Sequence, residues 1–567
     1  MRSAQVGPRP RERAALETRF PRCSSVSLDP LVPAATYSRR MNSRSLFLRK
    51  MHSTEDPGHG PGLKKTLTAF DLTLLGIGAI IGAGLFSSIK EMIVGRYHSD
   101  GTVAMLGAGP AVPLSFLLTA MACGFAALCY AEISAMVPAS GSAYSYSYAA
   151  FGELVAWVIG WDLMIEYAIG NVYVAQSWAD YFQTFLLGLH EGWMLPAWLT
   201  KDFQSATALV SGATRTLADA AASAADQETA RATLAVWEGV PRIGHWVLSI
   251  NLPAMSITLL LTTLLFLGVR ESARANAVMV FLKVGLVIAF IAVGVWTLVH
   301  RGTNHWTPFA PNGFRGIWQG AALGFFSYIG FDAVSTAGEE CKNPQRDLPR
   351  GLIGSLLICT VLYVLVATVL TGVVPWQELK SNDPLAFAMN HMGFQSVATL
   401  FAFGAMVAMT AVLLVFQYGQ TRIFMVMSRD GLLPPVFSRV HPRFRTPHVS
   451  TWITGLVVAL SCSILTPDQA IGLCNIGTLF AFILVSVGVI VLRRRAPDRP
   501  RPFRVPGYPV TPIISALACL GLIMGLERSN WLRLLIWLAL GLIVYFAYSY
   551  RHSVLRRELA AREGAGG

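Results

Sequence analysis

The stretch GIGAIIGAGLF, from Gly76 to Phe86, places four glycines within eleven residues. It lies inside the longer apolar run AFDLTLLGIGAIIGAGLFSSI, which has the length of a membrane span. Each glycine destabilises a helix by about 1 kcal/mol relative to alanine, so a regular membrane helix gains nothing from four of them. The stretch therefore predicts that the middle of this span has a special role.

Three interpretations of these glycines compete. A dinucleotide-binding fingerprint fails, because GxGxxG starting at Gly76 needs glycine where the chain has Ile81, and no strand precedes it. Gly78 and Gly82 do form a GxxxG helix-packing face. The third interpretation is an unwound segment in mid-span, where freed backbone N–H and C=O groups line an enclosed cavity and suit the two charges of a zwitterion.

The rest of the chain is also apolar. Of its 567 residues, 53% are hydrophobic and 14% are charged, whereas a soluble domain carries about 25% charged residues. This composition predicts an all-α polytopic membrane protein. The net charge of +13 is spread over short loops rather than concentrated on a soluble module, which argues against a nucleic-acid partner.

We expect three parts in the chain. Residues 1–63 are rich in Arg, Pro and Ser and are predicted to be a disordered cytosolic tail, 64–550 to be a transmembrane domain, and 551–567 to be a cytosolic C-terminal tail. Twelve stretches are candidate spans. They are 67–90, 110–137, 150–186, 246–268, 273–299, 316–339, 351–374, 395–427, 449–466, 470–492, 510–527 and 531–550.

The basic residues of the short loops set the orientation. With the N-terminus inside, the inner loops hold most of them, including the run RRRAPDRPRPFR from Arg493 to Arg504. This asymmetry predicts that both termini lie in the cytosol. The one long outer loop, 187–245, is alanine-rich and too polar to span. We expect a helix or two over the outer face, serving as surface decoration, with a gating role as the alternative.

The sixth candidate span repeats the interruption of the first. Gly324 and Gly330 bracket the segment FFSYIGFD in mid-span, where aliphatic residues alone would suffice. Five spans separate the two interruptions, and an odd number reverses orientation. The pattern therefore predicts inverted repeats with paired broken helices, the arrangement that marks the binding site of secondary transporters.

Three blocks of sequence carry a family resemblance. GIGAIIGAGLF, GFFSYIGFDAVSTAGEECKNPQRDLPRG and YGQTRIFMVMSRDGLLP resemble the amino acid–polyamine–organocation (APC) superfamily, most of all the bacterial form of its cationic amino acid transporter family. The resemblance implies twelve transmembrane helices, arranged as two inverted five-helix repeats with helices 1 and 6 broken, plus two extra helices. It also implies an amino acid substrate bound between the first and sixth spans.

The resemblance further implies which residues contact the substrate. Phe326 would be an aromatic lid that closes the outer path, with ordinary helix packing as the alternative. The implied substrate-binding residues are Ile80, Gly82, Ala83 and Gly84 of the first span, Phe326, Ser327 and Ile329 of the sixth, Glu166 of the third and Met409 of the eighth.

Ionisable side chains inside a membrane are functional candidates, because each costs about 2.5–3.5 kcal/mol to insert. Glu166 would hold a substrate amine indirectly or lock the outer gate, or else be a neutral buried carboxyl. Asp332 follows the second interruption and is predicted to cap the helix there. Lys283 lies in the apolar run VMVFLKVGLVIAF and matches the lysine of proton-coupled relatives. We expect it to donate to carbonyls of the broken first span near Gly82, with a structural pairing to an acid as the alternative.

These features predict a secondary active amino acid permease that imports its substrate with protons by alternating access. The chain has no GxxxxGK[ST] or GxSxG motif and no HExxH, so we expect neither an enzyme nor a cofactor nor a metal. The alternatives are an exchanger, a sensor that binds without transport, and a channel. The expected partners are an amino acid, a proton and membrane lipid; a small membrane-protein partner stays open.

The eighth span bears on the substrate. In GAMVAMTAVLL, Met409 matches a position that faces the pocket in the family. A bulky apolar side chain there shortens the pocket and gives a long cationic side chain no polar partner, and burying an unpaired charge is unfavourable. The sequence therefore predicts neutral substrates such as alanine in preference to arginine.

Overall fold

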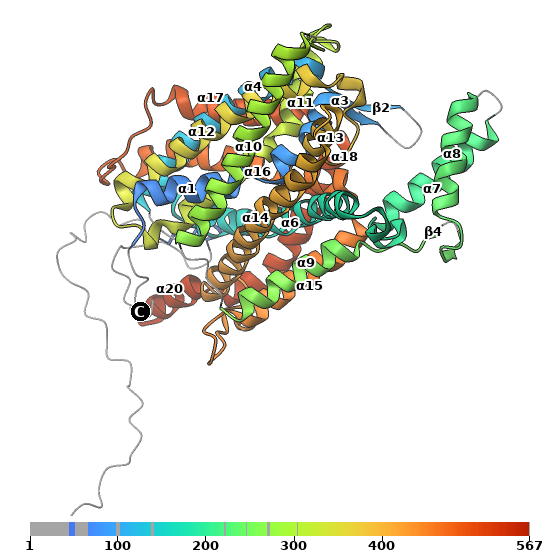
Figure 1. Ribbon diagram of the computed structural model, residues 1–567. Coiled ribbons are helices and arrows are strands. Elements are labelled where there is room, and N and C mark those ends of the chain that lie inside the picture. The colour runs from blue at the N-terminus through green and yellow to red at the C-terminus, as the bar shows by residue number, and fades with distance from the viewer. Residues whose placement is uncertain are drawn as a thin grey trace, which may run out of the picture. The chain divides into compact units, whose positions relative to one another are not determined.

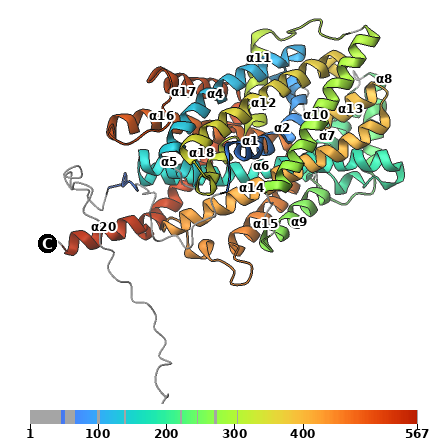
Figure 2. The ribbon, with the colours of Figure 1, turned by 60° about the vertical axis from the view of Figure 1, so that its left-hand side comes forward.

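The computed structural model describes residues 45–50, 66–97, 102–137, 141–219, 223–244, 246–268, 273–302 and 304–565. The predicted tail 1–63 lies outside these ranges except for 45–50. Within the described residues the fold is helical, with two short antiparallel β-hairpins. Figures 1 and 2 show the long helices crossing one another in a bundle, with the α7–α8 pair at its edge.

The helices and strands have the following bounds. The α-helices are α1 (Ala69–Ile80), α2 (Ala83–Phe86), α3 (Ile89–Val94), α4 (Val112–Met136), α5 (Ser142–Ala150), α6 (Glu153–Leu189), α7 (Phe203–Ala218), α8 (Ala224–Val236), α9 (Leu252–Phe266), α10 (Ala273–Arg301), α11 (Gly313–Gly324), α12 (Pro344–Val373), α13 (Pro384–His391), α14 (Gln395–Arg429), α15 (His448–Ile464), α16 (Pro467–Arg495), α17 (Val510–Gly525), α18 (Arg528–Val544), α19 (Tyr550–His552) and α20 (Val554–Ala565). The strands are β1 (Gly95–Tyr97), β2 (Val103–Leu106), β3 (Arg242–Ile243) and β4 (Trp246–Val247).

Each of the twelve predicted ranges contains helix. Among the described residues, six helices are both long and apolar enough to cross a membrane; they are Gly109–Met136, Ala277–Arg301, Pro344–Val373, Gln395–Arg429, Pro467–Arg495 and Arg528–Ala561. The apolar helices α1, α9, α15 and α17 are shorter. The count of twelve spans and the inverted repeat stay predictions.

One predicted boundary is wrong. The fourth range was expected to be helical from residue 246, but Trp246 and Val247 form strand β4 and the helix starts at Leu252. The cause is local, because the Asn251 side chain accepts a hydrogen bond from the Ala254 N–H and caps the helix. Pro253 then occupies the first turn, where its missing N–H does no harm.

The first span breaks after Ile80. A capping box between Thr68 and Asp71 starts α1, and the chain becomes extended at Ile81, with φ −75° and ψ 101°. Gly82 follows, and the four-residue helix α2 begins at Ala83. We call the stretch around this interruption, Ala79–Gly84, the first break.

The sixth span breaks in the corresponding place. Helix α11 passes into the 3₁₀ turn η5 (Phe325–Tyr328), Ile329 is extended, and Gly330 has a φ of +113° that favours glycine. The second half, η6 (Asp332–Glu340), is a 3₁₀ helix rather than the α-helical half expected from the sequence. We call the stretch Ser327–Gly330 the second break.

Each helix around the breaks packs against particular neighbours. Helix α1 lies against α12, α10 and α14, while the 37-residue helix α6 packs along α14 and α16. Helix α4 packs against α12, α11 and α17. Both breaks are therefore enclosed by protein, which is the condition under which irregular backbone is tolerated at membrane depth.

The start of α6 ties both ends of the chain to the bundle. The Glu153 carboxylate is fully buried and accepts hydrogen bonds from the Tyr545 hydroxyl at 2.8 Å and from Arg556 Nη2 at 2.8 Å. The Glu153 N–H donates to the Leu48 carbonyl at 2.8 Å. The C-terminal segment thus packs onto α6 through Arg556 of α20.

Replacing Glu153 by alanine should destabilise the protein by about 3 kcal/mol, because it leaves the buried Arg556 guanidinium without its carboxylate. Thermal unfolding in detergent measures the effect. The control is Glu558→Ala on the same C-terminal helix, where the side chain is exposed and the change should stay within about 0.5 kcal/mol. Equal stability of the two variants would contradict the prediction.

Candidate functional site

The two breaks touch each other at the backbone. A Cβ atom added to Gly84 would lie 2.4 Å from the Ser327 Cα, and one added to Gly330 would lie 2.9 Å from the Ala79 carbonyl oxygen. Neither contact leaves room for a side chain. Gly84 of the first span and Gly330 of the sixth therefore allow the two interrupted spans to cross in contact.

Side-chain hydroxyls hold the crossing. The Ser327 hydroxyl donates to the Gly84 carbonyl at 2.8 Å, and the Ser88 hydroxyl donates to the same oxygen at 2.6 Å. On the other side of the first break, the Tyr363 hydroxyl of α12 donates to the Ile80 carbonyl at 2.9 Å. Carbonyls that lose their helical donors at a break thus receive side-chain donors instead.

Lys283 approaches the first break from α10. Its side chain is fully buried, and its ammonium donates to the carbonyls of Gly78 at 2.7 Å and Ile81 at 3.2 Å. A longer contact of 3.5 Å reaches the Ala408 carbonyl on α14. An ammonium has three N–H donors, so these three acceptors match it. The side chain joins the first span to α10 and α14.

Phe326 lies beside the third span. Its ring packs edge-on against the Tyr173 ring of α6, with 4.8 Å between the ring centroids, and the side chain is only 5% exposed. Ile329, the residue that follows η5, is also buried. The ring thus sits between the second break and α6, where ring packing and a covering role are both compatible with its geometry.

Met409 lies on α14, whose next turn touches the first break. It is fully buried, and Val412, three residues on and therefore on the same helix face, would contact a Cβ atom added to Gly82 at 2.6 Å. Ala83, next to Gly82 at the start of α2, is buried as well. The side chains that surround the first break on this side are therefore apolar.

The acidic candidates form a separate group beside the second break. The Asp332 carboxylate accepts from the Gly330 N–H at 3.3 Å, so it binds the backbone of the second break. No side-chain capping bond is found at Phe331, where η6 begins. Glu166 of α6 lies close enough to interact with Asp332 and with Asp162 of the same helix. All three are buried, and within the described residues no hydrogen-bond partner is found for Glu166 Oε2 or for either Asp162 carboxylate oxygen.

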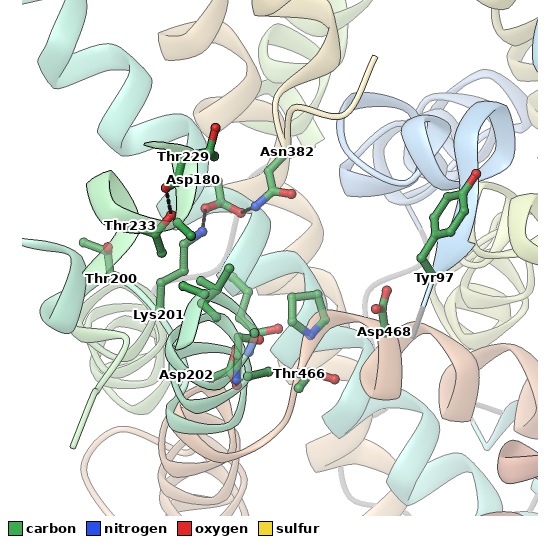
Figure 3. Close-up of a pocket in the computed structure, with 18 of the residues that line it drawn as sticks. Tyr97, Asp180, Thr200, Lys201, Asp202, Thr229, Thr233, Asn382, Thr466 and Asp468 are labelled. Atoms are coloured by element: carbon green, nitrogen blue, oxygen red, sulfur yellow. Dashed lines mark hydrogen bonds and ion pairs between the residues drawn. The ribbon is translucent and has the colours of Figure 1, made fainter. Parts of the chain in front are cut away.

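A cavity of about 960 Å³ lies between α7, α8 and the ends of α3, α6 and α16. Figure 3 shows Asp180, Lys201 and Asn382 converging from three different segments. Asp180 accepts from Lys201 Nζ at 3.1 Å and from Asn382 Nδ2 at 2.9 Å, and Lys90 donates to Asn382. The Asp180 carboxylate raises the pKa of Lys201 above its ordinary value. This network joins the 187–245 loop to the third span and to the end of the first.

Sequence reasoning did not single out several residues that build the site. Tyr363 and Tyr173 are aromatic residues in long apolar helices, where the sequence offers many equivalents. Asn475, whose side-chain amide donates to the Ala322 and Leu323 carbonyls at 3.0 and 3.1 Å, steadies α11 just before the second break. A polar amide within an apolar run was the available signal for Asn475, whereas Val412 had none.

Comparison with known proteins identifies the family of this chain. A family model described as "Amino acid permease" matches residues 67–547, which include both breaks, Lys283 and Met409. The chain belongs to the amino acid permease family. The resemblance to the APC superfamily is thereby confirmed, and the protein is an integral membrane protein of a transporter family rather than an enzyme.

The permease has relatives with several named substrates. It is 46% identical to the branched-chain amino acid permease BcaP of Bacillus subtilis over 87% of this chain and 95% of that protein. It is 43% identical to the methylthioribose transporter of the same organism, over 90% of this chain and 100% of that protein. It is 39% identical to the chloroplastic cationic amino acid transporter 9 of Arabidopsis thaliana, over 76% of this chain and 67% of that protein.

Gly84→Ala should disturb the crossing of the breaks, because the added methyl group meets the Ser327 backbone, which cannot rotate away. We expect a loss of about 1–3 kcal/mol of stability, typical of overpacking, with a lower thermal unfolding temperature in detergent. Gly521→Ala on α17 is the matched control, since nothing lies within 4 Å of its added Cβ. A Gly84→Ala protein as stable as this control would show that the contact is not needed.

Proposed function

We propose that the permease imports a neutral amino acid across the bacterial inner membrane together with a proton, by alternating access. The observation that carries the proposal is the pair of breaks in contact, with a buried lysine bound to the first of them. Membership of the permease family supports an amino acid substrate. Direction, coupling and substrate are the parts that need experiment.

The substrate would bind beside the breaks. Backbone N–H groups after the first break would receive its carboxylate, and carbonyls near the breaks would receive its ammonium. Ile80, Gly82, Ala83 and Gly84 would supply the first span's part. Phe326, Ser327 and Ile329 would supply the sixth span's part, with Phe326 covering the outer side.

Glu166 and Met409, which lie outside the two interrupted spans, would have different roles. Glu166 lies among acids near the second break, so it would act on the substrate amine through η6 rather than by direct contact. Met409 would set the length of the pocket from the α14 side.

Lys283 is the group that we assign to proton coupling. Protonated, it has the three donors that match the carbonyls of Gly78, Ile81 and Ala408. The neutral amine has one fewer N–H donor and no charge, so it would bind the carbonyls of the first span more weakly. The proton would thus favour one conformation over the other through different contacts in each, as coupling requires.

A neutral substrate is supported by the side chains around the first break and by two relatives. Ile80, Met409 and Val412 offer no partner for a cationic side chain, and an unpaired buried charge is unfavourable. The relatives of 46% and 43% identity are named for branched-chain amino acids and for methylthioribose, neither of which carries a net charge. The relative named for cationic amino acids is less similar, at 39%.

Uptake of labelled valine and alanine into proteoliposomes, with and without an imposed pH gradient, tests the function directly. We expect accumulation that needs the gradient and persists when choline replaces sodium. In Lys283→Ala the gradient-driven rate should fall at least about tenfold, the effect of losing about 1.4 kcal/mol of coupling, while substrate binding is retained. Lys342→Ala, with an exposed side chain in the inner loop, is the control and should transport normally.

Each other outcome of this experiment has a definite meaning. Accumulation by Lys283→Ala would refute the assignment of the lysine. Counterflow without gradient-driven uptake would identify an exchanger, and binding without uptake would identify a sensor. Dependence on sodium would contradict proton coupling.

Competition measurements test the role of Met409. Arginine at micromolar concentration should not displace labelled alanine from the wild type. Met409→Ser should enlarge the pocket and raise the affinity for longer side chains about tenfold, as expected when about 1.4 kcal/mol of steric exclusion is relieved. Met524→Ser on the exposed face of α17 should leave the competition profile unchanged. Strong arginine competition in the wild type would refute the preference for neutral substrates.

A further inference from the structure

The segment from Trp246 to Ile250, at the base of the 187–245 loop, exposes an apolar face. Trp246, Leu248 and Ile250 are 44%, 47% and 41% exposed, whereas Val247 and Ser249 between them are 1% and 5% exposed. This alternation is that of an extended chain, whose successive side chains point to opposite faces. The whole outward face of the segment is therefore apolar.

Hydrogen bonds fix the segment in this orientation. The Val247 N–H donates to the Thr207 hydroxyl at 3.1 Å, and the Ser249 hydroxyl donates to the Trp198 carbonyl at 3.0 Å. The Ile250 N–H donates to the same carbonyl at 2.9 Å. Trp198 itself is 40% exposed. We call Trp198, Trp246, Leu248 and Ile250 the apolar ledge.

The apolar ledge continues the outward surface of a membrane helix. Helix α9 follows at Leu252, packs against α15 and α6, and leaves Leu252, Leu260 and Leu267 exposed along its length or just past its end. Its 15 residues reach about 22 Å, which is shorter than the roughly 30 Å hydrocarbon layer. Figure 1 shows β4, where the ledge begins, beyond the end of α9 and below α7. The ledge thus adds apolar surface where the helix is too short.

The far end of the same loop has the opposite character. Helix α8 exposes Asp226, Glu228 and Arg231, which suit water. The ledge carries no charge and two tryptophans, the residue type enriched where a membrane meets water. The two ends of the loop are therefore built for different surroundings.

We propose that the apolar ledge is a membrane anchor that dips into the outer leaflet at the boundary between headgroups and acyl chains. Its partner is the lipid surface, and α8 extends from it into water. The loop would then be neither free decoration nor a mobile lid. Its anchoring would hold Lys201, which follows Trp198 closely in the chain, in place over Asp180 at the outer part of α6.

Site-specific fluorescence in proteoliposomes tests the anchor. Leu248→Cys is labelled with the fluorophore NBD, and Val236→Cys on α8, also apolar and 61% exposed, is the matched control. Seven native cysteines are buried, and Cys23 is replaced by serine in both proteins. Quenching is compared between a phospholipid with a doxyl group near its headgroup and aqueous iodide.

The anchor predicts opposite preferences at the two positions. The lipid quencher should act about threefold more strongly at position 248 than at 236, and iodide about threefold more weakly, as for a side chain at the membrane boundary. Equal iodide quenching at both positions would overturn the proposal. Protection from both quenchers at position 248 would also overturn it, since another protein or a second copy would then cover the ledge. Matching chromatographic profiles of the two unlabelled variants establish that both are folded.

Discussion

The contact between the two breaks is the constraint on which the rest of the site depends. Gly84 meets the Ser327 backbone and Gly330 meets Ala79, so at each contact one of the two spans must lack a side chain. Gly84 and Gly330 therefore permit a close crossing that brings irregular backbone from both halves of the chain to one place.

Backbone groups released by the first break are bound by side chains from other elements. Lys283 comes from α10, Tyr363 from α12 and Ser327 from η5, and each donates to a carbonyl of the first span. The break is thus stabilised by the helices against which it would move. Any displacement of α1 must exchange these bonds for others. Under the proposed coupling, loss of a proton from Lys283 would therefore alter the balance between conformations directly, whereas the hydroxyls keep their protons at physiological pH.

The sequence indicated much of this arrangement because its strongest signals are local. Gly82 and Gly330 mark departures from helix, and a lysine in an apolar run needs polar partners nearby. The conformation of η6 and the partners of Ile80 could not be read in the same way, because they depend on contacts between elements far apart in the chain. The start of α9 was misplaced for a related reason: the apolar residues of the ledge extend the hydrophobic run, while Asn251 and Pro253 decide where the helix begins. Hydrophobicity alone does not distinguish a span from apolar chain at its edge.

The 187–245 loop is stabilised differently from the main hydrophobic core. Its own small cluster of Ala206, Val210, Trp237 and Val247 is separate from the main core, so its fold does not depend on the breaks. Among the described residues its links to the bundle include polar ones, such as the Gln183 side chain with the Leu195 backbone and Lys201 with Asp180. Polar links at an aqueous face contribute little stability on their own. Apolar contact with lipid at the base of the loop would supply what they lack, and it would do so on the side of α9, away from the path between the two breaks.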